Sequence, residues 1–183
     1  MNDYIYHNTT KIIFGRSAEK YIGSECKALA DGGKVLLLLG GGSAKKSGLY
    51  DKVVASLNES GVEFTELWGV QPNPRIDKVR EAAMTAKREN VSLILAVGGG
   101  SVIDTAKAIG YGVEYDGDFM DLYLGKAAPV SCLKIGAILT IPGAGLRIGR
   151  KGNSHIAVPQ IGHKAAVMFR RIFPTVDPPE DPL

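Results

Sequence analysis

Runs of apolar residues of strand length alternate along the chain with segments in which apolar residues recur at helical spacing. The apolar or alternating runs occupy residues 34–39, 62–68, 93–97 and 135–141. Helices are predicted over residues 17–29, 48–58, 76–88 and 102–109, with a shorter helix around residue 120. Uninterrupted apolar strands between amphipathic helices are typical of a parallel sheet covered on both faces. The pattern therefore predicts an α/β fold.

Two of these strands end in three glycines and a serine. Gly40-Gly41-Gly42-Ser43 follows the first apolar run, and Gly98-Gly99-Gly100-Ser101 follows the third. The carboxyl ends of parallel strands share one edge of a sheet, so the two turns are expected to flank one crevice. Glycine lets the backbone approach a ligand, and the free N–H groups of a following helix attract phosphate. The pair predicts a phosphate-binding crevice; the alternative is two tight connections without a ligand.

Polar residues near these turns are candidates for the same crevice. Ser101 is predicted to cap the following helix, with Asp104 reaching back to its N–H group. Thr140 lies near the carboxyl end of the last apolar run, where its hydroxyl faces either the crevice or its strand neighbours.

The loop Pro72-Asn73-Pro74 is expected at the same edge of the sheet, because two prolines force an extended path. Asn73 would present its amide to a nucleotide or cap the following helix. Lys45 and Lys46 come just after the first glycine turn. They would meet a phosphate or remain solvated surface lysines.

Composition excludes several classes of function. The 183 residues carry a net charge of +3 with interleaved acids and bases, so no nucleic-acid partner is expected. No apolar run approaches the roughly 20 residues that span a bilayer, and the first residues lack a signal core. No membrane association and a cytoplasmic location are predicted. The two cysteines, Cys26 and Cys132, are predicted to be thiols rather than a disulfide.

Five motifs, in order, resemble the N-terminal half of the iron-containing (group III) alcohol dehydrogenases, in particular the butanol dehydrogenase branch. They are Asn8-x-Thr10-Lys11-Ile12-Ile13-Phe14-Gly15, Gly40-Gly41-Gly42-Ser43-x-Lys45-Lys46-x-Gly48-x-Tyr50-Asp51, Gly69-Val70-x-Pro72-Asn73-Pro74-Arg75, Ala96-Val97-Gly98-Gly99-Gly100-Ser101-Val102-Ile103-Asp104 and Leu139-Thr140-Ile141-Pro142. The resemblance implies a Rossmann-like parallel sheet that binds NAD(H) or NADP(H), over residues 1–145. It also implies a small alcohol or aldehyde substrate and a homodimer.

The resemblance also implies roles for individual residues. Gly98 to Ser101 would receive the pyrophosphate, with Asp104 close by, and Gly40 to Ser43 would flank the cofactor. Asn73 and Thr140 would line the adenosine and nicotinamide parts of the cleft. Gly41 stands where strictly NAD-using relatives place an aspartate for the ribose hydroxyls. NADP(H) is therefore admissible beside NAD(H), with Lys45 or Lys46 reaching its 2′-phosphate.

The metal site of the family is not expected in this chain. The resemblance implies Fe²⁺ or Zn²⁺ held by an aspartate and three histidines of a C-terminal helical domain. Here the histidines are His7, His155 and His163, none in that context. The expected function is an NAD(P)-dependent alcohol or aldehyde oxidoreductase, present as a truncated chain that binds the cofactor but has no metal or catalytic residues of its own. The alternative is a non-catalytic dinucleotide-binding remnant.

The sequence departs from the family after Gly145. Residues 146–183 are predicted to form a divergent tail with little regular structure, apart from a short helix over residues 165–171. The family continues with Gly-Ser-Glu, whereas this chain has Gly145-Leu146-Arg147-Ile148. One permitted choice of codons for these four residues is GGG CTC AGA ATC. The same bases read one position later encode Gly-Ser-Glu.

A one-base insertion near codon 145 is therefore predicted. Sequencing the coding DNA should show Gly-Ser-Glu in a neighbouring frame at this point. Codons that restore no family residues in any frame would rule the insertion out.

Overall fold

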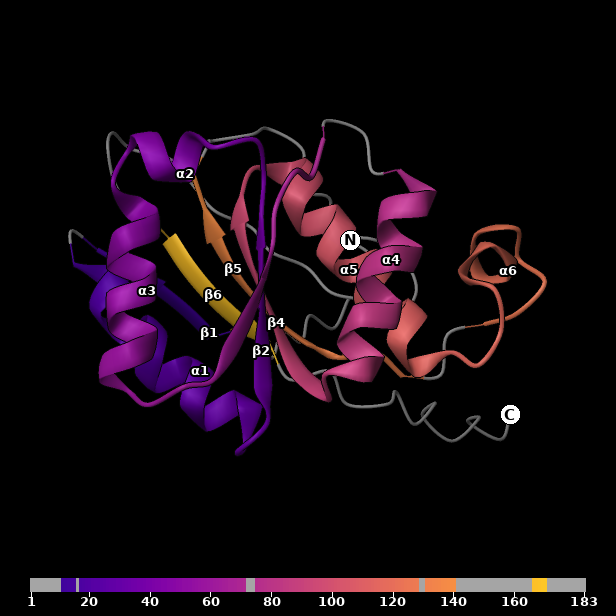
Figure 1. The fold of residues 1–183 in the computed structure, drawn as a ribbon, viewed down its shortest axis with the longest axis horizontal. Coiled ribbons are helices and arrows are strands. Elements are labelled where there is room, and N and C mark those ends of the chain that lie inside the picture. The colour runs from indigo at the N-terminus through magenta and orange to yellow at the C-terminus, as the bar shows by residue number, and fades with distance from the viewer. Residues whose placement is uncertain (1–10, 16, 72–74, 129–130, 141–165, 171–183) are drawn as a thin grey trace, which may run out of the picture.

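The computed structural model describes residues 11–15, 17–71, 75–128, 131–140 and 166–170, and its strands form one sheet with helices on both faces (Figure 1). In chain order the elements are β1 (Lys11–Phe14), η1 (Ala18–Tyr21), α1 (Ile22–Ala30), β2 (Lys34–Leu39), α2 (Ser43–Lys46), α3 (Leu49–Glu59), β3 (Phe64–Leu67), α4 (Ile76–Arg88), β4 (Val91–Gly98), α5 (Gly100–Glu114), α6 (Phe119–Tyr123), β5 (Lys134–Leu139) and β6 (Ala166–Arg170).

The strand order is β1-β6-β5-β4-β2-β3. Strands β3, β2, β4 and β5 run parallel, whereas β6 is antiparallel to both β5 and β1. From β2 the chain continues to its neighbour β3, towards one edge of the sheet. From β4 it continues to its neighbour β5, towards the opposite edge. The strand order therefore reverses between β2 and β4, which is where open α/β sheets bind ligands. The predicted α/β fold with a parallel sheet is confirmed.

Alternate residues of the central strands pack into two separate cores. Leu36, Leu38, Ile94 and Ala96 face helices α4 and α5, whereas Val35, Leu37, Leu93 and Leu95 face α1 and α3. In Figure 1 the α1–α3 pair and the α4–α5 pair lie on opposite sides of the sheet. Burial on both faces is the reason why these strands are uninterrupted apolar runs.

Helix α4 has the predicted bounds, whereas α5 is longer than predicted and ends at Glu114 rather than near Ile109. The earlier end was predicted from the polar and acidic character of residues 111–126. A Cβ atom added to Gly110 would lie 2.7 Å from Cys132 Sγ. Glycine thus allows the helix to approach the segment before β5 closely, and it does not break the helix.

The predicted helix over residues 165–171 is wrong. Residues Ala166–Arg170 form strand β6, whose register pairs Ile138 with Val167 on one side and Ile13 with Val167 on the other. Pairing with two strands satisfies the backbone groups of β6, and this tertiary contribution outweighs the local helical pattern.

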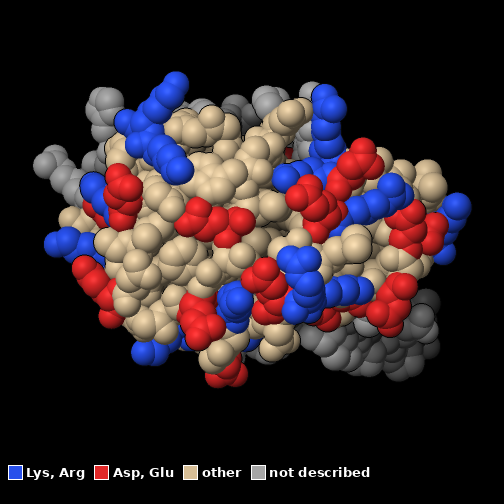
Figure 2. All heavy atoms as spheres, in the orientation of Figure 1, with Lys and Arg blue, Asp and Glu red and all other residues tan. Residues whose placement is uncertain are grey.

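Charged side chains of both signs are mixed on the face shown in Figure 2. Several form ion pairs, such as Lys34 with Glu89 at 3.2 Å and Arg80 with Asp118 at 2.7 Å. Positive charge is therefore not concentrated into a stripe on this face. Within the described residues, no helix combines the length and the apolar character needed to cross a membrane.

Both cysteines lie in the described part of the chain, and neither forms a disulfide, as predicted. Cys26 is buried between α1 and the sheet. Burial, with a smaller contribution from the charge of Glu25, raises the pKa of the Cys26 thiol to about 12. Its reactive thiolate is therefore very scarce at neutral pH.

We expect Cys26 to resist alkylation in the folded protein. In a C132S variant at pH 8, iodoacetamide should leave Cys26 unmodified under native conditions, because both access and the thiolate fraction are low. In denaturant the same cysteine should be labelled fully, as measured by intact mass. Rapid stoichiometric labelling of the native variant would contradict the buried position of Cys26.

Candidate functional site

The two glycine turns lie side by side at the carboxyl edge of the sheet. Strands β2 and β4 are paired in parallel with Leu39 opposite Val97, so both chains leave the sheet at the same level. The Val70 N–H donates to the Leu39 carbonyl at 3.2 Å, and the Thr140 N–H donates to the Gly98 carbonyl at 3.0 Å. These bonds tie the ends of four strands into one edge. The two turns therefore lie at one edge of the sheet, as predicted.

Glycine is required at different positions of the two turns for different structural reasons. A Cβ atom on Gly98 would lie 2.5 Å from Val102 Cγ2, so this glycine allows α5 to pack against its own strand. Gly42 has a φ of +113°, which favours glycine. Cβ atoms on Gly41, Gly42 or Gly100 would meet no described atom within 4 Å. As far as the described residues show, the space beside these glycines is open, as a backbone cradle for a ligand requires.

Thr140 brings an unsatisfied hydroxyl to the same edge. Its Oγ1 atom is buried and has no hydrogen-bond partner among the described residues. A buried hydroxyl without a partner costs about 1–3 kcal/mol, so such groups are commonly paired with a ligand or water. The sequence left two roles open for the Thr140 hydroxyl. A hydrogen bond to a strand neighbour, which is one of them, is not observed among the described residues. The position fits a group that hydrogen-bonds to a bound molecule.

The predicted capping role of Ser101 is wrong. Gly99 is the N-cap of α5, and Ser101 lies inside the first turn, where its carbonyl accepts a hydrogen bond from Thr105 Oγ1 at 2.8 Å. Asp104 does not reach back to Ser101 but accepts from Lys107 Nζ at 3.1 Å. The helix begins earlier than predicted, with Gly100 as its first residue. Its first hydrogen bonds are donated by the Val102 and Ile103 N–H groups to the Gly99 carbonyl, at 3.1 and 3.3 Å, so the N–H groups that remain for a ligand are those before Val102.

Lys45 is exposed at the surface, which is one of its two predicted roles. Its ammonium group lies over the rings of Trp68 and Tyr50, at 4.3 and 5.1 Å from their centroids. Such cation–π contacts compete with binding of a phosphate. The rings are held in turn by Glu66, which accepts from Tyr50 Oη at 2.6 Å and from Trp68 Nε1 at 2.7 Å. The bond to Glu66 is the main reason why the pKa of Tyr50 rises to about 12.

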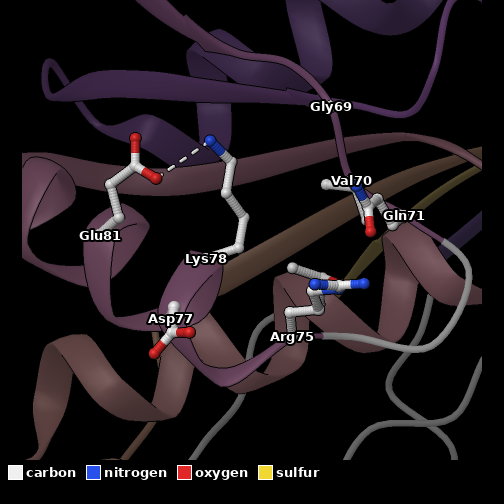
Figure 3. A pocket seen from close by; sticks show the side chains of 8 residues that line it. Gly69, Val70, Gln71, Arg75, Asp77, Lys78 and Glu81 are labelled. Atoms are coloured by element: carbon white, nitrogen blue, oxygen red, sulfur yellow. Dashed lines mark hydrogen bonds and ion pairs between the residues drawn. The ribbon is translucent and has the colours of Figure 1, made fainter.

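A cavity of about 280 Å³ lies beside the glycine turns (Figure 3). It is lined by Gly69, Val70, Gln71, Arg75, Asp77, Lys78, Glu81 and Thr105. Thr105 is hydrogen-bonded to Ser101, and the Val70 carbonyl would lie 3.7 Å from a Cβ atom on Gly40. The cavity therefore adjoins both turns.

None of the predicted cofactor-binding residues lines this cavity, and Asn73 lies outside the described residues. Sequence reasoning did not identify Arg75 and Lys78, which line this cavity. The signal that identifies Arg75 is its place directly after the Pro-Asn-Pro loop, at the N-cap of α4. Lys78 follows one turn later on the same helix.

The described residues do not supply a metal centre. No group of three or more histidine, cysteine, aspartate or glutamate side chains within them is arranged to hold a metal ion. A metal used by these residues would need ligands from outside the described part of the chain.

Comparison with known proteins identifies the family. The sequence model described as "Iron-containing alcohol dehydrogenase" matches residues 9–176. The chain belongs to the iron-containing alcohol dehydrogenase family. The match continues past Gly145, where the sequence motifs of the family end.

Individual relatives show which members of the family this chain is similar to. Probable NADH-dependent butanol dehydrogenase 1 of Bacillus subtilis is 46% identical over 145 residues, which are 79% of this chain and 37% of that protein. The NADPH-dependent aldehyde reductase YqhD of Escherichia coli is 32% identical over 148 residues, with the same coverage. The crystal structure of NADH-dependent butanol dehydrogenase A from Thermotoga maritima has a TM-score of 0.71 and 44% identity, covering 76% of this chain and 39% of that one. The chain thus spans little more than a third of the length of these relatives.

We expect the two glycines of the second turn to respond differently to substitution. Gly98→Ala should lower the free energy of unfolding by about 1–3 kcal/mol, because its Cβ atom overlaps Val102. Gly100→Ala should keep or slightly raise stability, since its Cβ atom meets open space at the start of a helix. Urea unfolding of both variants checks this. Equal losses would contradict the close packing at Gly98.

Proposed function

We propose that this chain binds NAD(H) or NADP(H) across its two glycine turns, as the dinucleotide-binding part of an alcohol or aldehyde oxidoreductase of the butanol dehydrogenase type. The observation that carries the proposal is the adjacency of the two turns at the point where the strand order reverses. The space that the described residues leave beside Gly41, Gly42 and Gly100, together with the N-terminal end of α5, suits a pyrophosphate.

Each part of the crevice has a role in this proposal. Gly98 to Ser101 bind the pyrophosphate through backbone N–H groups, and Gly40 to Ser43 form the opposite wall. Thr140 donates or accepts a hydrogen bond at the nicotinamide end through its unpaired hydroxyl. The bound nicotinamide supplies hydride acceptance from an alcohol, or hydride donation to an aldehyde. The protein contributes binding, orientation and exclusion of water from this edge.

Support for both cofactors comes from the relatives. Butanol dehydrogenases at 46% and 42% identity are named as NADH-dependent, whereas an aldehyde reductase at 32% identity is named as NADPH-dependent. Their names also support a small alcohol or aldehyde as substrate. Fe²⁺ or Zn²⁺ would polarise the substrate oxygen. Since the described residues hold no metal cluster, we separate cofactor binding from turnover in the tests.

We expect Thr140→Val to raise the stability of the protein and to weaken its binding of NADH. Removing a buried hydroxyl without a partner should raise the free energy of unfolding by about 1 kcal/mol. The same change should weaken NADH binding roughly five- to tenfold, measured by fluorescence titration, because the hydrogen bond to the cofactor is lost. Thr140→Ser, which keeps the hydroxyl, is the matched control and should retain binding.

Absence of NADH and NADPH binding by the wild-type chain at millimolar concentrations would overturn the proposed function. Butanol oxidation with added Fe²⁺ or Zn²⁺ tests turnover separately. Sedimentation tests the homodimer that the resemblance implies.

A further inference from the structure

We propose that Glu66 is a positioning residue for the first glycine turn, Gly40 to Ser43. It acts through the rings of Tyr50 and Trp68, which hold Lys45 of the helix that continues the turn. We call these four side chains the aromatic cluster. The inference rests on the proposed function, in which the turn forms one wall of the dinucleotide site. Glu66 and Trp68 lie outside the five motifs shared with the family.

The first glycine turn does not fix its own conformation. Glycine has the widest choice of backbone conformations, and three of them follow one another here. Cβ atoms on Gly41 or Gly42 would meet no described atom within 4 Å. Side-chain packing around these two glycines is therefore not what holds the turn in place. Its position depends on the segments at its two ends.

Both ends of the turn are attached to the segment directly after β3. At the β2 end, the Val70 N–H donates to the Leu39 carbonyl at 3.2 Å. At the other end, α2 begins at Ser43, and the ammonium group of its Lys45 lies 4.3 Å from the centroid of the Trp68 ring. The segment after β3 therefore supports the turn from both sides.

Glu66 sets the orientation of the two rings. Its carboxylate accepts hydrogen bonds from Tyr50 Oη at 2.6 Å and from Trp68 Nε1 at 2.7 Å, one through each oxygen. The ring centroids are 5.1 Å apart, with 57° between the planes. These three side chains are half-buried, whereas Lys45 is exposed. An exposed lysine has many rotamers, so the oriented rings give Lys45 its fixed position.

Helix α2 has few other attachments. It consists of four residues without a side-chain cap at its start, and Ala44 is its buried side chain. A helix of this length is not stable by itself. Together with Ala44, the contact of Lys45 with the rings therefore keeps α2, and the turn before it, in one place. A turn that is already in place loses less entropy when a ligand binds.

The test compares two substitutions of Glu66 in the 183-residue chain, with NADH as the ligand. Glu66→Leu removes both hydrogen bonds and should weaken NADH binding roughly three- to tenfold, because the net contribution of those bonds limits the effect. Glu66→Gln keeps an acceptor for Trp68 Nε1 and gains a donor for Tyr50 Oη, so binding should stay within about twofold of the wild type. An equal loss in both variants would contradict positioning by geometry.

Two measurements without cofactor report on the turn itself. Trp68 is the one tryptophan of the sequence, so its fluorescence reports the cluster directly. In Glu66→Leu its emission should shift to longer wavelength, because the indole gains contact with water. Amide hydrogen exchange should become faster over residues 40–47 and stay unchanged over residues 98–104 of the second turn. Unchanged exchange over residues 40–47, or unchanged NADH affinity despite faster exchange, would overturn the inference.

Variants of Lys45 show whether the cluster acts as one unit. Lys45→Met should weaken NADH binding about two- to fivefold, whereas Lys45→Arg should retain it, because arginine also lies over aromatic rings. In the Glu66→Leu background, Lys45→Met should have little further effect, since the cluster is already broken. Additive losses would mean that Lys45 acts on the ligand independently, which would overturn the role assigned to Glu66.

A matched control removes the same charge from the other end of β3. Glu63 is exposed directly before the strand. Glu63→Leu should change neither NADH binding nor exchange over residues 40–47, and a loss equal to that of Glu66→Leu would overturn the inference. Normal NADH binding by the wild type and by Glu66→Leu would overturn this inference alone. Absence of dinucleotide binding by the wild type would overturn the proposed function as well.

Discussion

The parallel pairing of β2 with β4 is the constraint on which the site depends. The chain crosses from β2 to β3 in one direction and from β4 to β5 in the other, so the strand order reverses at this pair. Its register sets Leu39 opposite Val97 and therefore places Gly40 and Gly98 at the same height. A shift of the register would separate the two turns. The apolar residues buried on both faces of the pair hold that register in place.

The turns pack closely against α5 on the side of the core, whereas no described atom lies within 4 Å of a Cβ atom built on Gly41, Gly42 or Gly100. Val102 of α5 fills the volume that a side chain at Gly98 would take, and it also lies 3.4 Å from a Cβ atom on Gly40. One valine thus lies against both turns from the side of the core. Gly110 lets the same helix approach Cys132 near the start of β5. Helix α5 is therefore held at both of its ends, and its first N–H groups have a fixed direction.

The strands, the helices and the adjacency of the turns were predictable because they depend on hydrophobic periodicity and on the geometry of parallel sheets. The misses have a different origin. The contact of the exposed Lys45 with the rings of Trp68 and Tyr50 was not foreseen, because it joins separate elements and no local pattern encodes it. Strand β6 exists because β1 and β5 offer two partners far away in the sequence. Serine is a common N-cap residue, but α5 begins at Gly100 with Gly99 as its N-cap, so Ser101 lies inside the first turn.

Two cations near the turns, Lys45 and Arg75, have different surroundings. Lys45, the cation nearest in sequence to the first turn, is held by the aromatic pair that Glu66 fixes, so it anchors α2 to the end of β3. Arg75 follows β3 and lines the cavity, and no described residue forms an ion pair or side-chain hydrogen bond with its guanidinium. Lys45 would have to leave the two rings before it could bind a phosphate, because a cation–π contact competes with such binding. A cation next to a glycine turn in the sequence is therefore not by that position alone a phosphate ligand.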